Sequence, residues 1–171
     1  MAVKLNAELD AYFNTGDQPS ESNFQDLIDT IQPPLVELSD ADTSLTVADH
    51  AFRTLIMPAL GADRTLTMPT PAAHVWFHIE YFGDLAGADG SEDLKIVTNT
   101  LNSEFFHGMV THLDTDNAIA SVHGNGSSND SIDVLAADGA SLWFLGKSST
   151  VWYVWGTITA ATTPTIADTL S

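Results

Sequence analysis

The chain has 171 residues, enough for one domain with a short appendage and for a hydrophobic core that is stable without disulfides or a structural metal. It has no cysteine, which excludes disulfides, thiolate zinc sites and cysteine nucleophiles. Five Lys and Arg face 23 Asp and Glu, a formal net charge of −18 that repels nucleic acid and anionic membranes. We expect neither a membrane span nor a signal peptide, because no apolar run is long enough and residues 1–8 lack one.

Residues 1–34 predict a helical segment, a short hairpin of two helices. Both helices show apolar residues at helical spacing: Leu5, Leu9, Tyr12 and Phe13 in the first, and Phe24, Leu27, Ile28 and Ile31 in the second. Gly16 ends the first helix, Ser20 is a good N-cap for the second, and Pro33-Pro34 ends it. The segment either packs on the rest of the fold or forms an arm that grips a partner.

Residues 35–160 predict a β domain, because Val, Thr, Leu and Ile rise there between Gly, Pro, Asn and Asp turns. The expected strands are Leu35–Leu38, Ser44–Val47, Thr54–Met57, Thr65–Met68, Val75–Phe82, Leu94–Thr98, Phe105–Leu113, Ile119–His123, Ser131–Leu135, Ser141–Leu145 and Thr150–Thr159. Residues 161–171 read as a polar tail that extends or frays. The predicted fold is mainly β (α+β), with the helical hairpin followed by an antiparallel β-sandwich or barrel.

Two of these strands differ in their patterns. In Val75–Phe82, Val75, Phe77, Ile79 and Tyr81 share one face, and His74, Trp76, His78 and Glu80 share the other. In Val151–Ile158 both faces are apolar, with Val151, Tyr153 and Trp155 on one and Trp152, Val154 and Ile158 on the other. A strand that is apolar on both faces is covered on both sides. The second cover is either this chain's own core or a neighbouring subunit.

Histidine and acidic clusters are the candidates for chemistry. His74 and His78 lie about 13 Å apart on a strand, too far to hold one ion, and no Glu follows the first as in a zinc protease. His112, Asp114 and Asp116 would alternate onto one side of an extended segment, where a metal could use them. The loop Asp84–Asp93 is acidic and Gly-rich but lacks EF-hand spacing. Solvated strand ends and an exposed loop explain both segments without a metal.

Motifs of nucleophilic and nucleotide chemistry are missing from the sequence. It contains no Gly-x-Ser-x-Gly elbow, no Walker phosphate loop and no dinucleotide fingerprint. Asn125-Gly126 and the serines after it are typical of a hairpin turn. We therefore predict that the chain is not an enzyme, with no catalytic residue, cofactor or metal.

One stretch resembles a segment common in virion structural proteins of tailed phages: Leu9–Ser20 (LDAYFNTGDQPS), then Phe24 and Asp26–Asp29 (DLID). The β part resembles phage decoration and fibre modules at Arg64–Pro69 (RTLTMP) and in its last strands, Ser131–Leu135, Gly139–Phe144 and Thr150–Val154. It departs from them at Pro71–His74 (PAAH), where those modules often place a Gly. The resemblance implies a role in the virion without catalysis, usually as a trimer on the capsid or in a fibre.

The favoured function is that of a capsid decoration (cement) protein on the outer surface of the virion. Its partners would be the major capsid protein and itself, as a homotrimer, with no nucleic acid and no membrane. The alternatives are a phage fibre, tail or receptor-binding module that recognises a host glycan through Trp76 or Trp143, an enzyme, and an acidic protein of a saline environment. The candidate interface residues are Phe24, Leu27, Ile28, Trp152, Tyr153 and Trp155.

Overall fold

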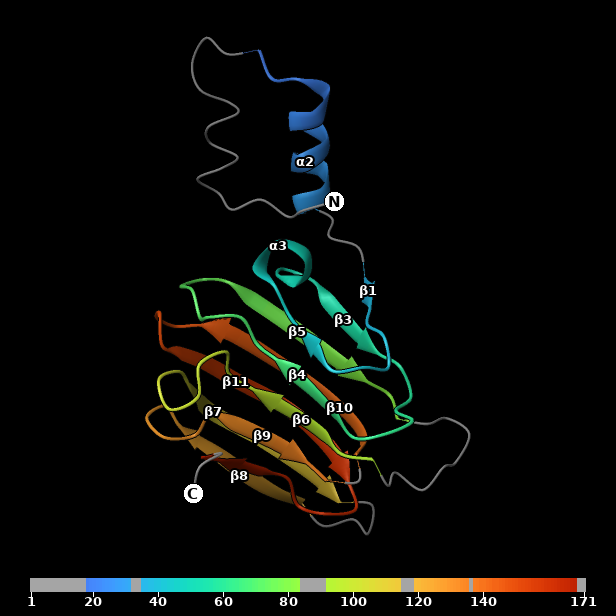
Figure 1. The fold of residues 1–171 in the computed structure, drawn as a ribbon, viewed down its shortest axis with the longest axis vertical. Helices are drawn as coiled ribbons and strands as arrows, with labels where there is room; N and C mark the ends of the chain where they lie inside the picture. Colours follow the sequence, from blue (N-terminus) through green and yellow to red (C-terminus); the bar gives the residue numbers. More distant parts are fainter. Residues whose placement is uncertain (1–17, 32–34, 84–91, 115–118, 136, 169–171) are drawn as a thin grey trace.

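The computed structural model describes residues 18–31, 35–83, 92–114, 119–135 and 137–168. Among the described residues, strands far outnumber helices, which confirms the mainly β prediction. The strands form two sheets that lie as two layers (Figure 1). Neither described helix has the length and hydropathy needed to cross a membrane.

The larger sheet has seven strands and the smaller has five. In spatial order, the seven are β1 (Val36–Glu37), β3 (Thr54–Met57), β5 (Trp76–Tyr81), β10 (Ala137–Gly146), β11 (Val151–Ala160), β7 (Phe105–Asp114) and β8 (Ile119–Asn125). The five are β12 (Thr165–Ala167), β9 (Ser131–Val134), β6 (Leu94–Val97), β4 (Arg64–Thr67) and β2 (Thr43–Ser44). Each of the eleven predicted strands overlaps one of these.

The first six strands wind as a coil. Successive strands alternate between the two sheets, and each strand from β3 to β6 lies beside the strand two before it. A chain that crosses to the other layer and back returns in its original direction, so these four pairings are parallel. With β7 beside β11, five of the ten pairings are parallel. The prediction of antiparallel sheets is therefore wrong for half of the pairs.

The second half of the larger sheet is built on a long hairpin. Strands β10 and β11 pair antiparallel and lie between β5 and β7. The pairing of β11 with β7 runs in parallel over ten residues, from Val151 opposite Phe105 to Ala160 opposite Asp114. At Gly108 the backbone φ is +149° and an added Cβ would lie 1.9 Å from the Val154 carbonyl oxygen, so this approach requires glycine.

A single hydrophobic core lies between the two sheets and takes side chains from both. Its largest members are aromatic and come from the larger sheet: Phe77, Phe106, Phe144 and Trp152. The Trp152 ring meets Phe77 edge to face at 5.5 Å, and its indole Nε1 donates to the Pro69 carbonyl at 3.2 Å. Since Pro69 follows β4 closely, Trp152 ties the two layers together.

Of the predicted helical hairpin, the second helix is confirmed as α2 (Glu21–Ile31). The predicted N-cap is confirmed too, because the Asn23 backbone N–H donates to Ser20 Oγ at 3.2 Å. The first helix lies outside the described residues, so the hairpin itself is not confirmed. Figure 1 places α2 beyond the end of the sheets where the short helix α3 (Val47–His50) lies.

Two elements are absent from the sequence-based prediction. The helix α3 is capped by Thr46, whose Oγ1 accepts from the Asp49 backbone N–H at 3.1 Å. Within the predicted tail, residues 165–167 form β12, which pairs with β9. The β fold therefore extends past residue 160, where the prediction ended it, because a strand of three residues gives too short a pattern to detect.

Candidate interaction surface

The candidate surface is the outer face of the seven-stranded sheet, the face turned away from the five-stranded sheet. Strand β5 shows how the alternation of residues in the sequence determines which side chains lie on this outer face. Phe77, Ile79 and Tyr81 are buried in the core, whereas the side chains that alternate with them are only partly covered. The predicted alternation of this strand is thus confirmed from Trp76 to Tyr81. His74 lies before the strand, exposed and with a φ of +68°.

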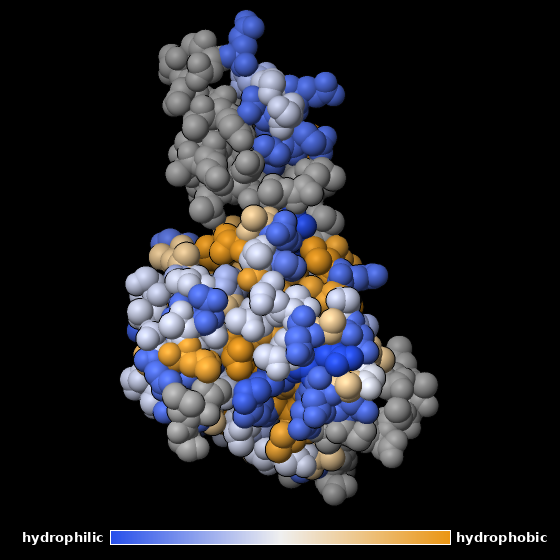
Figure 2. Space-filling model, in the orientation of Figure 1, coloured by the Kyte–Doolittle hydropathy of each residue, from blue (hydrophilic) through white to orange (hydrophobic). Residues whose placement is uncertain are grey.

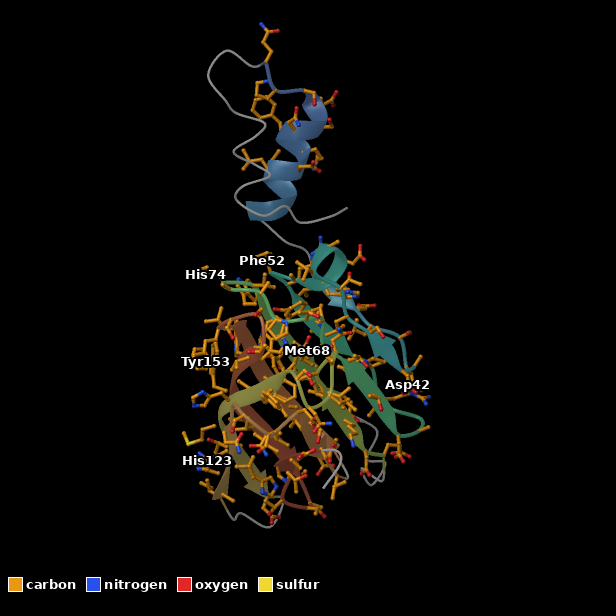
Figure 3. The ribbon with its side chains drawn as sticks, turned by 60° about the vertical axis from the view of Figure 1, so that its left-hand side comes forward. Asp42, Phe52, Met68, His74, His123 and Tyr153 are labelled. Carbon is orange, nitrogen blue, oxygen red and sulfur yellow. The ribbon has the colours of Figure 1, made fainter. Side chains whose placement is uncertain are left out.

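Four strands, β10, β11, β7 and β8, place their outward side chains in four cross-strand rows. The rows are Leu145–Tyr153–His107–Asn125, Trp143–Trp155–Met109–His123, Ser141–Thr157–Thr111–Ser121 and Gly139–Thr159–Leu113–Ile119. We call this set the outer grid. It holds no Asp, Glu, Lys or Arg, in a chain with 23 acids. Figure 3 shows Tyr153 and His123 on one side of the molecule and Asp42 on the opposite side.

Four large apolar side chains of the outer grid are open to solvent. Ile119 is 74% exposed, Met109 50%, Trp155 44% and Leu113 38%. Trp155 and Met109 lie opposite each other in one row, and Leu113 and Ile119 in another. Within the described part of the chain, no element covers them. Apolar surface that is contiguous, exposed and rimmed by polar groups marks an interaction site.

The outer side of the five-stranded sheet has a different chemistry. There Lys95 on β6 and Asp133 on β9 form an ion pair, with Nζ and Oδ1 3.5 Å apart. At one end of β4, Arg64 Nε donates to Asp40 at 2.6 Å, and this bond lowers the pKa of the Asp40 carboxyl. Figure 2 shows hydrophilic residues over much of the side on which β4, β6 and β9 lie. The two layers thus present one side with ion pairs and another whose four central rows hold no Asp, Glu, Lys or Arg.

Aromatic rings on the outer face stand side by side. The rings of His78 and Trp143 stack at 4.0 Å with 13° between their planes, and those of Trp143 and Trp155 stack at 6.2 Å with 8°. Trp76 leans on Trp143 at 5.4 Å. Trp143 lies between His78 and Trp155, so both faces of its ring are covered. Sugars pack on open ring faces, where the π electrons lie, so this stack suits a protein partner better than a glycan.

His78 joins this stack to a hydrogen-bond network. Its Nδ1 lies 3.1 Å from Thr54 Oγ1, and its Nε2 lies 2.8 Å from Glu80 Oε1 and 3.2 Å from Ser141 Oγ. Ser141 Oγ also lies 2.9 Å from Glu80 Oε1 and donates to it. Burial lowers the pKa of His78, although Glu80 opposes the shift. A neutral ring that donates from Nε2 to Glu80 and accepts at Nδ1 from Thr54 satisfies the network.

This network contains Ser, His and Glu but lacks the order of a catalytic triad. In a triad the serine and the acid bind opposite ring nitrogens, so that the acid orients the base toward the hydroxyl. Here Ser141 and Glu80 share Nε2 of His78, and the serine proton points to the carboxylate. The arrangement therefore holds the stacked rings in place and does not activate the hydroxyl.

A shallow depression of about 300 Å³ adjoins the stack on the outer face. Its lining is mixed: it includes the acids Glu80 and Asp138, the hydroxyl residues Ser141, Thr157 and Thr159, and the aromatic residues Tyr81 and Phe82. Among the described residues, no group of three or more His, Cys, Asp or Glu is arranged to hold a metal. The depression thus lies where the outer grid meets the two acidic residues.

The six predicted interface residues lie in three places. Tyr153 and Trp155 are on the outer face, where the sequence pattern put them together. Trp152 is fully buried between the sheets, so it is a core residue of this chain and not part of its surface. On α2, Phe24 is 49% and Ile28 54% exposed, and Leu27 is partly buried.

The predicted metal candidates separate in the structure. His112 is buried on the inner side of β7, where its Nε2 lies 2.9 Å from the Ala160 carbonyl oxygen. Asp114, at the end of the same strand, is partly exposed. Asp116 and most of the acidic loop, residues 84–91, lie outside the described residues. His112 is therefore a hydrogen-bonded core histidine.

Sequence reasoning missed most of the outer grid. Met109, Leu113 and Ile119 were not singled out, although Phe105, His107, Met109, Thr111 and Leu113 alternate within a predicted strand. The sequence pattern that could have identified these residues is a second apolar face on the strand, as in Val151–Ile158. What the pattern could not show is that β7 and β11 are neighbours, which brings the two apolar faces together.

Comparison of the chain with protein-family models, with curated proteins and with solved structures gave no match. What the outer face binds therefore follows from its own chemistry.

Proposed function

We propose that this chain is a structural protein of a tailed-phage virion, a decoration protein on the outer surface of the capsid. It would bind the major capsid protein and stabilise contacts between capsid subunits. The observation that carries the proposal is the outer face of the seven-stranded sheet, where four cross-strand rows hold no acid, Lys or Arg and leave four large apolar side chains exposed. Lys147 lies beside these rows, with its Nζ 5.1 Å from the centroid of the Tyr153 ring. Apolar and aromatic surface of this kind supports a protein-binding role.

The charge of the chain supports this location. A net charge of −18 disfavours contact with packaged DNA, because DNA binding depends on cations that meet phosphates. On the outside of a shell, the same charge keeps decorated particles apart and soluble. The resemblance of Leu9–Ser20 and Asp26–Asp29 to segments of phage virion proteins is the reason for proposing a tailed-phage capsid.

The helix α2 is the element that we assign to the shell. It is amphipathic, and Phe24 and Ile28 keep about half of their surface exposed. Figure 1 draws it beyond the two sheets. An amphipathic helix binds by laying its apolar side chains into a groove of its partner, and a groove between capsid subunits would tie those subunits together.

Rebinding to capsids that have been stripped of this protein tests the proposal. We expect the purified chain to bind the shells and to raise their melting temperature. Ile28→Asp should weaken binding at least about tenfold, because it removes an apolar contact and places a charge in the groove. Ser22→Asp adds the same charge to the same helix at an exposed polar position and should bind as the wild type does. A wild-type chain that ignores stripped shells overturns the proposal.

A receptor-binding module that recognises a host glycan is the second candidate. The depression beside the ring stack favours it, because its carboxylates and hydroxyls could bind sugar hydroxyls. A glycan array separates the two functions. Saturable binding of one glycan that Thr157→Ala and Thr159→Ala abolish, together with no binding to shells, would select this candidate.

A further inference from the structure

We propose that the outer face binds a second copy of this chain, so that two seven-stranded sheets pack face to face about a two-fold axis. The inference rests on the proposed function only in treating the outer face as a protein-binding surface. It goes further in naming the partner, the central residues and the symmetry.

Charge identifies the partner. Two chains with a net charge of −18 repel each other wherever carboxylates meet. At the outer grid they can approach with fewer such contacts, because none of its rows holds an acid and the nearest carboxylates, Glu80 and Asp138, lie beside the rows. A basic partner would gain by binding the carboxylates, whereas a second copy has to avoid them. An uncharged face on so acidic a chain therefore fits self-association best.

The size of the face is sufficient for a weak dimer. From β3 to β8 the sheet spans five strand spacings of about 4.8 Å, three of them within the outer grid, and the four rows span six residues of about 3.3 Å. The other two spacings bring in β5, whose Glu80 carboxylate already accepts from Ser141 and lies 2.8 Å from His78 Nε2. The flat area is roughly 500 Å² per copy, so a pair would bury about 1,000 Å², the lower limit for a specific interface. We therefore expect a dimer that depends on protein concentration.

The symmetry follows from the single face. When one patch binds the same patch on another copy, the contact is closed by a two-fold axis and a dimer results. A trimer, which the resemblance to phage decoration proteins implies, needs two different patches that fit each other. Trp155 and Met109 lie in adjacent strands near the middle of the grid, where interface residues contribute most.

Sedimentation velocity of the full chain over a range of concentrations tests the inference. We expect a monomer–dimer equilibrium whose limiting mass is twice 18.3 kDa. Added salt should tighten the dimer, because it screens the repulsion between the two acidic chains and leaves the apolar contact intact. Association through ion pairs would weaken with salt instead. A monomer at all concentrations up to about 1 mM, a trimer, or dissociation by salt would overturn the inference.

A matched pair of variants locates the contact. Thr157→Glu places a carboxylate from each copy in the middle of the grid and should raise the dissociation constant at least about tenfold. Thr165→Glu makes the same change at an exposed position of β12, in the other sheet, and should dimerise as the wild type does. Equal melting temperatures of the dilute variants show that both are folded. A dimer that Thr157→Glu leaves intact contradicts the assignment of the face.

Binding to stripped shells tests the proposed function independently of dimerisation. Monomeric Thr157→Glu should still bind shells through α2, although more weakly because it engages one site at a time. Shell binding by a wild-type chain that never dimerises would reject the inference and leave the proposed function standing. A dimer that ignores shells would do the reverse.

Discussion

Strand β11 presents two tryptophans three residues apart that lie in opposite environments. Trp152 points between the sheets, is 0% exposed, and donates its indole proton to the Pro69 carbonyl. Trp155 points away from them, is 44% exposed, and stacks on Trp143. The sequence treats the two faces of this strand alike, since both are apolar. The fold covers one face and leaves the other open.

The difference teaches that apolar character alone does not separate a core from an interface. The inner face is covered by this chain itself, because Leu66, Ile96 and Ile132 of the five-stranded sheet pack in the same core. The outer face has the same kind of side chain but no second layer. Mutations on the two faces should therefore act on different quantities, the stability of the monomer and the affinity between chains.

The largest expected effect is at Trp152. Trp152→Ala should lower the free energy of unfolding by about 3–5 kcal/mol, because it leaves a cavity between the sheets. Urea denaturation measures this loss, which should not depend on protein concentration. Total stabilities of small domains are about 5–15 kcal/mol, so the milder Trp152→Phe serves as the second variant. It keeps an aromatic ring near Phe77 and loses the bond to Pro69, and a loss close to zero would contradict the core assignment.

A smaller effect on stability is expected at Trp155. Trp155→Ala should cost the dilute monomer about 1 kcal/mol, because the ring is partly exposed and contributes mainly its stack on Trp143. Its main effect should be on dimerisation, measured by sedimentation at concentrations where the wild type associates. If Trp155→Ala destabilises the monomer as much as Trp152→Ala and leaves the sedimentation profile unchanged, both faces of β11 are core.

The local pattern predicted the strands well. Thr54–Met57 has the predicted bounds, and the alternation in Val75–Phe82 gave the right inner and outer faces. Alternation reports only that a residue points in or out of a sheet, which is a property of a few neighbouring residues. Strand order depends on pairings between distant segments, such as β7 with β11, and no short window contains that information. For this reason the parallel pairs and β12 could not be predicted.

The candidate surface was predicted in part for the same reason. Tyr153 and Trp155 stood out because their strand is apolar on both faces. Placing Trp152 among the interface residues was the consequence of not knowing which face the second sheet covers. The uncharged grid could not be seen at all, because its rows join residues as far apart as Met109 and Trp143.

The smallest expected effect is a dependence on pH at His78, which lies on the outer face but is largely covered. Burial lowers its pKa in the folded chain below the usual 6.5, against the pull of Glu80. Below that pH the unfolded chain binds more protons, so stability rises with pH. The contribution of the neutral ring is therefore complete above pH 6.5 and is lost as the pH falls toward the folded pKa.

His78→Gln removes this titration, so the variant should lose less stability than the wild type between pH 7.5 and pH 5.5. Urea denaturation at protein concentrations too low for dimerisation measures the difference without adding a charge beside Ser141. Burial also lowers the pKa of His50. His50→Gln should therefore remove a separate part of the pH dependence of stability, and the effects of the two substitutions should add. An unchanged pH dependence in His78→Gln would contradict a lowered pKa of His78. A variant that loses more stability than the wild type as the pH falls would mean that the bond to Glu80 outweighs burial and raises the pKa of the folded ring.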